Sequence, residues 1–334
     1  CGSKTPKTDS NATRIFTDST GREVEVPAQI DKVALSGPLA QIVLFALCPD
    51  KLVGVSNAWS SEAQEFLDEK YFNMPQIGQL YGGKGELNLE TLLQSGAQVV
   101  IDVGESKGSI KEDMDSLQQQ TGIPFVHISA DMQSYPQAYR MLGDLLGMKT
   151  EAEALATYCE KIYSRTETIA SGVEKANALY VTGDMGQNVI AKGSYHAEIL
   201  DMLTNNLAQV DEPSSKGTGN EVSMEQILTW NPDVVIFAPE SIYATVKDDA
   251  AWQSVTAIKN GAYYEVPFGP YNWMGFPPSV QRYLGMVWLS KLLYPDATAD
   301  YDLFADVQEY YKLFYHCDIT RAQYDTLVAN SIGK

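Results

Sequence analysis

Two segments of this chain repeat one pattern, and the repeat constrains the fold more than any other feature. NLETLLQSGAQVVI runs from Asn88 to Ile101, and SMEQILTWNPDVVI runs from Ser223 to Ile236. Each has a polar start, a glutamate, apolar residues at helical spacing, a breaker and a Val/Ile run, which predicts a short capped helix followed by a buried strand. Two such units in corresponding places indicate two similar lobes. Chance similarity is the alternative, because helix-turn-strand units are common and the copies share few identities.

Length and charge narrow the class of protein. A chain of 334 residues suggests about two domains of ~150 residues each. The formal net charge of -19, without any basic stripe, argues against a nucleic-acid partner, because phosphate backbones are bound by clustered Lys and Arg. No apolar run reaches the roughly 18 residues that cross a bilayer.

The four cysteines have no metal-ligand spacing. Cys48 and Cys159 lie in apolar helical contexts, which predicts buried free thiols. Cys1 is followed by a hydrophilic stretch, CGSKTPKTDSNAT, which predicts a flexible tether over residues 1–14. This start resembles a mature bacterial lipoprotein with a lipidated Cys1, and an arbitrary start of the sequence is the alternative.

The remaining chain predicts two α/β series separated by one helix. In residues 15–149, TRIFTDSTGREVEVP predicts a hairpin, and the strands KVALSG, KLVGVS, QVVIDVG and PFVHIS alternate with the helices PLAQIVLFALC and SYPQAYRMLGDLLG. Residues 150–175 predict one long helix, with Thr150 as N-cap and Glu153 at the capping-box position. Residues 176–334 predict the strands NALYVTGD, NVIAKG, NLAQV, DVVIFAP and AYYEVPF, then an amphipathic helix VQRYLGMVWLSKLLYP and further helices. The predicted fold class is α/β, with two Rossmann-like lobes joined by one long α-helix and a ligand cleft between them.

The order of these segments resembles a known family. The NLE and SME repeats, DKVALSGPLAQIVLFALCPDKLVGVS, the single linker helix and YNWMGFPPSVQRYLGMVWLSKLLYP together resemble an ABC-transporter substrate-binding protein of the rigid-helix-linker subgroup, which serves siderophores, haem, cobalamin and related metal complexes. The resemblance implies a monomer at the cell surface or in the periplasm, anchored to the membrane through Cys1, and an importer permease as partner. It also implies that Glu90 and Glu225 dock onto permease arginines; the alternative is that each is a helix-start charge.

Ligands of two-lobed α/β proteins bind beyond the carboxyl ends of the strands. That edge predicts ligand contacts from Ser36, Gly37, Trp59, Ser60, Tyr81 and Lys84 in the first lobe and Tyr195, His196, Tyr271, Trp273 and Arg282 in the second. The aromatic residues suit a sizeable flat or hydrophobic ligand, unless they only fill loop cores. The Arg282 guanidinium could clamp a carboxylate or oxyanion, or equally bond backbone carbonyls of its own loop.

No pattern predicts catalysis or a bare metal site. His127, His196 and His316 lie in separate segments, and GxGxxG, GxxxxGK[ST] and HExxH are all missing from the sequence. We therefore expect no catalytic residue, no protein-held metal and no cofactor, and a ligand that is itself a chelated metal or metal oxyanion. An iron complex such as a siderophore or haem is the first expectation, and molybdate, tungstate or a corrinoid is the alternative. An α/β enzyme with a cleft active site and a surface adhesin are the alternatives of a different class.

Overall fold

The computed structural model describes residues 11–81 and 86–333, which form two compact units. The first unit contains the chain up to Ala58 and the segment Tyr71–Thr157. The second contains Trp59–Lys70 and the chain from Tyr158 onward. The segment around Trp59 therefore packs with the C-terminal half of the sequence, although it lies within the range 15–149.

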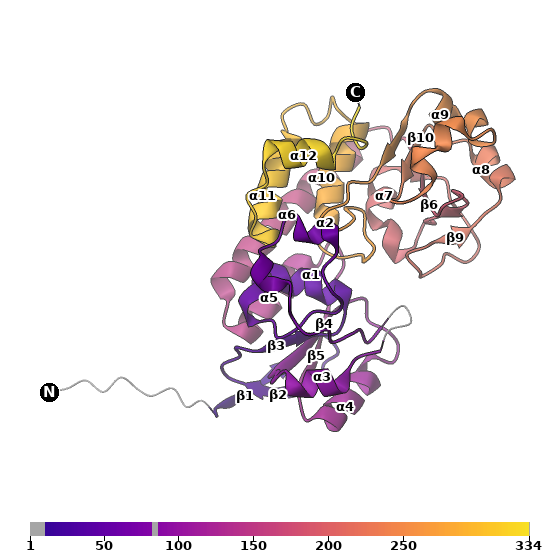
Figure 1. The fold of residues 1–334 in the computed structure, drawn as a ribbon. Coiled ribbons are helices and arrows are strands. Elements are labelled where there is room, and N and C mark those ends of the chain that lie inside the picture. Colours follow the sequence, from indigo (N-terminus) through magenta and orange to yellow (C-terminus); the bar gives the residue numbers. More distant parts are fainter. Residues whose placement is uncertain (1–10, 82–85, 334) are drawn as a thin grey trace. The chain divides into compact units, whose positions relative to one another are not determined.

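The first unit is built on a parallel sheet of strand order β3-β4-β5, beside an antiparallel hairpin of β1 and β2 (Figure 1). Its elements are β1 (Thr13–Thr17), β2 (Glu23–Pro27), β3 (Val33–Leu35), α1 (Pro38–Leu47), α3 (Leu89–Gln94), β4 (Val99–Gly104), α4 (Ile110–Thr121), β5 (Phe125–Ser129) and α5 (Tyr135–Leu146). Every residue of β4 is buried, which is why its sequence is a continuous apolar run and not an alternating one. The predicted hairpin, the helix that begins with Pro38 and the strands around β4 are confirmed.

One predicted strand of this unit is wrong. KLVGVS forms only single bridges, from Leu52 to Val33 and from Val55 to Gln76. Leu52 and Val55 pair with two different segments, so the stretch does not form a continuous ladder with either of them. Gly54 between them lies so close to its neighbours that a Cβ there would be 2.5 Å from the Ile77 side chain.

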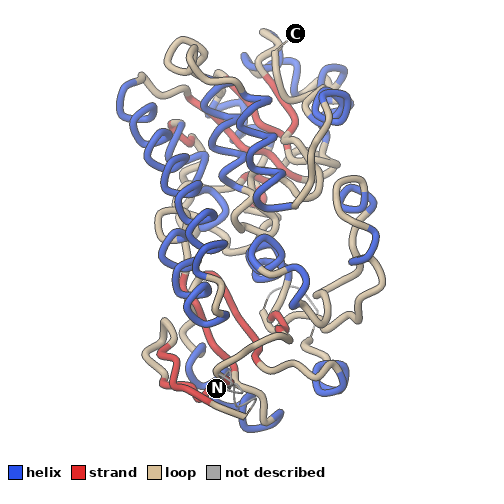
Figure 2. Tube along the Cα trace, turned by 90° about the vertical axis from the view of Figure 1, so that its left-hand side faces the viewer, coloured by secondary structure: helices blue, strands red, loops and turns tan. Residues whose placement is uncertain are grey.

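The predicted long helix is present as α6 (Lys149–Gly172), which is shared between the two units and is continuous in Figure 2. The predicted capping box is wrong, because the helix begins at Lys149 and Thr150 lies inside its first turn. Glu153 instead accepts two hydrogen bonds of 2.9 Å from the Arg140 guanidinium on α5. A bidentate, charge-assisted pair is stronger than a neutral cap contact, so the glutamate faces the arginine.

The second unit is built on a mixed sheet of strand order β11-β10-β6-β7-β9, with β8 paired to β6. Its strands are β6 (Asn177–Thr182), β7 (Asn188–Val189), β8 (Asn205–Asn206), β9 (Asn220–Glu221), β10 (Val234–Phe237) and β11 (Tyr263–Glu265). Its helices include α2 (Ser61–Gln64), α7 (Glu198–Leu203), α8 (Met224–Trp230), α9 (Thr256–Lys259), α10 (Arg282–Leu293), α11 (Leu303–Tyr315) and α12 (Arg321–Leu327). Strand β10 is parallel to both neighbours, β6 and β11, and all its residues are buried.

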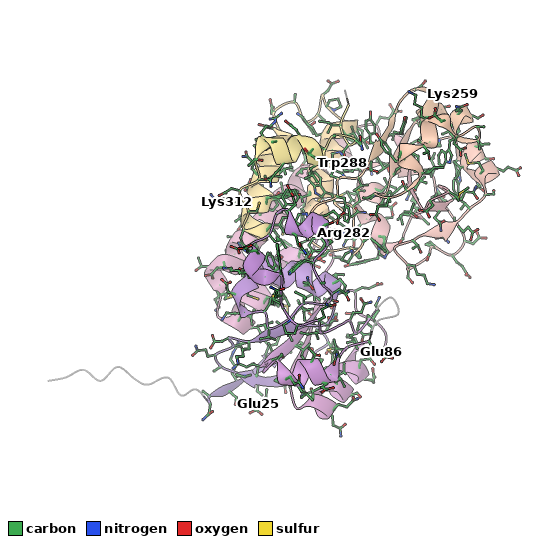
Figure 3. All side chains as sticks on the ribbon, viewed as in Figure 1. Glu25, Glu86, Lys259, Arg282, Trp288 and Lys312 are labelled. Carbon is green, nitrogen blue, oxygen red and sulfur yellow. The ribbon has the colours of Figure 1, made fainter. Side chains whose placement is uncertain are left out.

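Helix α10 is not amphipathic, contrary to the sequence prediction. All residues from Arg282 to Ser290 are buried, because α10 packs against both α7 and α11. Figure 3 labels Arg282 and Trp288 of this helix. The Trp288 indole N–H donates to the Ser331 carbonyl at 2.7 Å, so even the polar atom of this ring is satisfied inside the unit. The exposed Lys312, labelled in Figure 3, belongs to α11, which carries the solvent-facing polar residues.

The repeated segments form the predicted helix-strand units in both halves of the chain. The Asn88 side chain accepts from the Thr91 N–H at the start of α3, and the Ser223 side chain accepts from the Gln226 N–H at the start of α8. Buried strands β4 and β10 follow. The α/β fold class with two sheet-containing lobes and one long helix is confirmed.

Candidate functional site

A row of polar side chains crosses the sheet of the first unit near the carboxyl ends of its strands. Leu35 pairs with Ile101 and Asp102 pairs with His127, so Ser36, Asp102 and His127 follow one another across β3, β4 and β5. Their exposed fractions are 4%, 8% and 0%. Buried polar groups in an apolar sheet are costly unless they bond one another, and these do.

The hydrogen bonds of the row converge on the Asp102 carboxylate. The Ser36 hydroxyl donates to one carboxylate oxygen at 2.5 Å, and His127 Nδ1 lies 2.6 Å from the other. Because an ionised carboxylate only accepts, Nδ1 carries a hydrogen. His127 Nε2 then faces two exposed hydroxyls, 3.0 Å from Ser106 Oγ and 3.1 Å from Ser129 Oγ. The two hydroxyl oxygens are 2.7 Å apart.

The turn of the β1–β2 hairpin holds the carboxyl end of β5 in place. The Asp18 carboxylate accepts from the His127 backbone N–H at 3.1 Å and from an Arg22 guanidinium N–H at 3.1 Å. Burial alone would raise the pKa of Asp18, but hydrogen bonds from Thr20 and His127 and the charge of Arg22 outweigh it and lower the pKa. Asp18 is therefore an ionised carboxylate that binds the backbone of β5 at His127.

Three predicted ligand residues of the first unit lie near this polar row. Ser36 belongs to it, Gly37 directly precedes α1, and the Ser36 carbonyl accepts from the Leu80 N–H at 2.7 Å, which brings Tyr81 to the same edge. The Tyr81 hydroxyl donates to Asp113 at 2.5 Å. Burial, this bond and the negative charges of Asp113 and Asp102 raise the pKa of Tyr81, so the phenol stays protonated. Lys84 lies outside the described residues, as does Cys1.

The other two residues that we assigned to the first lobe lie in the second unit. The Trp59 side chain is buried, and the Trp59 carbonyl accepts from Gln64 at 3.1 Å. The exposed Ser60 is the N-cap of α2, where its hydroxyl accepts from the Ala63 N–H. Both contacts organise the short helix α2.

Arg282 is fully buried and its guanidinium is committed within the second unit. It donates to the carbonyls of Tyr195 (3.0 Å), Pro278 (3.0 Å) and Ser279 (3.2 Å) and to the Glu198 carboxylate (3.2 Å). It also lies over the Tyr195 ring at 5.0 Å. These are the contacts of the loop-tying alternative, in which Arg282 bonds backbone carbonyls of the segment that precedes α10.

The predicted aromatic residues of the loop before α10 are packed as well. Trp273 has no exposed surface, and its indole N–H donates to the Tyr311 hydroxyl at 3.3 Å, while the Tyr311 hydroxyl donates to the Gly269 carbonyl. The Tyr271 ring lies 6.3 Å from the Tyr315 ring. These rings contribute to the core of the unit.

A different aromatic residue of this loop is exposed. Phe276 is 62% exposed and has a φ of 77°, which is uncommon for a residue with a side chain. Its ring lies over Gly217, where a Cβ would be 2.1 Å from the ring and 3.3 Å from His196. His196 itself bonds the Ser215 carbonyl through Nε2 at 3.2 Å. Sequence reasoning missed Phe276.

Sequence reasoning also missed the polar row beyond Ser36. The signal was a single polar residue in an otherwise apolar strand, Asp102 in VVIDVG and His127 in PFVHIS. From the sequence alone, His127 is a candidate only for metal binding. Within residues 11–81 and 86–333, no group of three or more His, Cys, Asp or Glu side chains is arranged to hold a metal ion.

Three further expectations concern the surface and the thiols. Glu90 and Glu225 are both exposed in the first turns of α3 and α8. Cys48 and Cys159 are buried free thiols, as predicted, and burial raises the pKa of Cys48 to about 12. None of the helices in the described part of the chain combines the length and the apolar character that a bilayer span requires.

Comparison with known proteins places this architecture in a family. The pattern of the family described as "Periplasmic binding protein" matches residues 33–269. The molybdate-binding protein MolA of Haemophilus influenzae is 24% identical, with 91% of each chain covered. An ABC transporter solute-binding protein of Sulfurospirillum deleyianum is 26% identical, with a TM-score of 0.86 over 95% of this chain and 99% of that one. A periplasmic solute-binding protein of Veillonella parvula is 25% identical, with a TM-score of 0.79 over 96% and 98%.

Proteins of this family bind transported solutes, work with ABC importer permeases, carry no cofactor and are not enzymes. The matched range spans most of the sequence and includes the polar row of the first unit, both repeated segments and the whole of α6. This chain belongs to the periplasmic binding protein family, the extracytoplasmic solute-binding components of ABC importers.

Proposed function

We propose that this protein captures a small metal oxyanion of the molybdate or tungstate class and delivers it to an ABC importer. One observation carries the choice. The strand ends of the first unit present serine hydroxyls, whereas three of the five aromatic residues that suggested a large flat ligand, Trp59, Tyr271 and Trp273, are packed into the second unit or against its rings. Hydroxyl and amide hydrogens suit oxygen acceptors of an anion. The name of the H. influenzae relative, similar over 91% of this chain, points to the same ligand class.

An iron complex such as a siderophore or haem is the second candidate. Phe276 is 62% exposed and Met185 is 68% exposed, in the loops that follow β11 and β6. Both loops lie at the carboxyl side of their strands, where α/β proteins bind ligands. Apolar side chains there would suit the organic part of a chelate.

We propose that the permease binds this protein through Glu90 and Glu225. Each glutamate is exposed, each stands in the first turn of an equivalent helix, and each unit carries one. Single exposed ion pairs contribute only about 0.2–1 kcal/mol, but pairs desolvated at an interface couple more strongly. A Glu90→Ala, Glu225→Ala double variant should keep its ligand affinity in solution and lose uptake in cells that contain the permease. Normal uptake at normal protein levels would refute the docking role.

A thermal-shift panel tests the ligand. It should include molybdate, tungstate, sulfate, a ferric siderophore, haemin and cobalamin at matched concentrations. Ligand at 100 times its Kd stabilises the folded state by ~2.7 kcal/mol, which is readily measured. We expect a shift with molybdate and tungstate. A shift only with the ferric siderophore or haemin would replace the first candidate by the second, and a shift only with cobalamin would indicate the corrinoid alternative.

A further inference from the structure

Three polar groups at the ends of β4 and β5 form a closed triangle in the first unit. His127 Nε2, Ser106 Oγ and Ser129 Oγ are separated by 2.7 to 3.1 Å. The imidazole has no exposed surface, whereas both serines are exposed. A buried titratable ring therefore meets two solvent-facing hydroxyls at the edge where ligands of this architecture bind.

We propose that Ser106 and Ser129 are hydrogen-bond donors to the bound oxyanion, and that His127, held by Asp102, is the positioning residue that directs their hydroxyl hydrogens outward when it takes up a proton. The inference rests on the proposed oxyanion function and names the groups that would perform it. It adds two contact residues and a proton requirement to that function.

The number of serine hydroxyl hydrogens that a ligand can use depends on whether the His127 ring is protonated. Asp102 accepts the Nδ1 hydrogen, so in the neutral ring Nε2 is an acceptor and takes one serine hydrogen. The second hydroxyl hydrogen is then the only one left for a ligand. When the ring is protonated, Nε2–H becomes a donor to the serine oxygens, and both hydroxyl hydrogens can point toward an anion. Binding of an anion through both serines therefore favours the protonated ring.

The surrounding charges allow this protonation. Asp102 faces Nδ1 directly, and Asp18 accepts from the His127 backbone N–H, so two carboxylates adjoin the ring. Arg22 is committed to Asp18 and to Asp115 at 2.8 Å. Among the other described residues, the Tyr81 phenol interacts with Asp102 and is kept neutral. Glu105 and Lys107 flank Ser106 as a pair 3.4 Å apart, which leaves no net charge on that loop.

Linkage fixes the sign of the effect. A ligand that favours the protonated form raises the affinity of the ring for a proton, and a proton raises the affinity for the ligand. At low pH, where the ring is already protonated without ligand, the affinity should be constant. At higher pH, where binding must bring in the proton, the Kd for molybdate should rise by up to about tenfold per pH unit for one linked proton.

The test is titration calorimetry of the full chain with sodium molybdate and sodium tungstate between about pH 6 and pH 9, a range in which histidine side chains commonly change their charge. Measurement in two buffers of different ionisation enthalpy gives the number of protons taken up. We expect uptake approaching one proton in the range where the Kd rises. Ser106→Ala and Ser129→Ala should each weaken binding by about tenfold or more, as for a hydrogen bond to a charged group. His127→Gln should abolish the pH dependence.

Matched controls separate positioning from folding. Ser109→Ala removes a hydroxyl of the same loop that bonds Asp113 at 2.8 Å, and His316→Gln removes a histidine at the end of α11; neither should change affinity or its pH dependence. If His127→Gln folds poorly, the proton uptake of the wild-type protein and the affinities of the two serine variants still test the proposal. Tight binding without proton uptake, or unchanged affinity in both serine variants, would overturn the inference while leaving the oxyanion function intact. A complete lack of molybdate and tungstate binding at every pH would overturn both.

Discussion

Replacing Arg282 by alanine tests whether this buried cation serves the fold. The wild-type guanidinium donates to three carbonyls, those of Tyr195, Pro278 and Ser279, and to the Glu198 carboxylate. The side chain of Arg282 has 0% exposure and that of Glu198 has 26%, so the carboxylate can regain water while the carbonyls are left largely unsatisfied. Removing one partner of a buried charged network costs about 3–5 kcal/mol, and we expect the free energy of unfolding to fall by that amount.

Urea denaturation followed by tryptophan fluorescence measures this loss. Trp273 and Trp288 are fully buried in the same unit and report on its unfolding. Arg321→Ala is the matched control, because that guanidinium is 66% exposed in an i,i+4 pair with Asp325, and its loss should cost about 1 kcal/mol or less. If Arg282→Ala were no less stable than Arg321→Ala but bound ligand weakly, the loop-tying role would be wrong and the clamp role restored.

Two further changes test the described contacts. Asp18→Asn should lower the free energy of unfolding at neutral pH and make it less dependent on acid. The pKa of Asp18 is depressed in the folded protein, so the stabilisation from this carboxylate is complete above the ordinary value of 3.8 and is lost as the pH falls through the lower folded value. Acid unfolding curves of the two proteins measure the difference. Gly219→Ala should destabilise the folded state by about 2–4 kcal/mol, because a Cβ would lie 2.3 Å from the Val189 carbonyl, whereas Gly122→Ala, also at positive φ but with nothing within 4 Å, should cost about 1 kcal/mol; thermal unfolding compares them.

Local patterns predicted the elements of this fold well where burial was uniform. Asn88 and Ser223 cap their helices because the side-chain oxygen of a short polar residue can accept from a backbone N–H that has no partner inside the helix. Helix α6 begins one residue earlier than predicted, and Glu153, which would have closed the capping box, bonds Arg140 of another helix instead. Pairings across long sequence distances are not visible in a local pattern, and they decide such boundaries.

The candidate site was less predictable for the same reason. Arg282 and Trp273 have side chains that suit ligand binding in general, but their bonds to Pro278 and Tyr311 exist only once α10 and α11 are packed. His127 was visible in the sequence, yet its partner Asp102 is on a neighbouring strand. Residue type shows which side chains are able to bind a ligand, and only the fold shows which of them already bond other residues of the protein.

The two copies of the repeated segment differ at the residue that directly follows them. When the repeated segments are matched, Asp102 directly follows NLETLLQSGAQVVI and Phe237 directly follows SMEQILTWNPDVVI. In the first unit this position holds a carboxylate that bonds a histidine on the next strand; in the second it holds a buried ring 5.4 Å from the Trp252 ring. A carboxylate in the second environment would be buried without a cation, and a phenyl ring in the first would leave the His127 Nδ1–H unbonded. The two copies thus keep the residues that make a helix and a strand and differ at the strand end. A polar, hydrogen-bonded edge therefore exists at this position in the first unit, whereas the second unit has an aromatic core there.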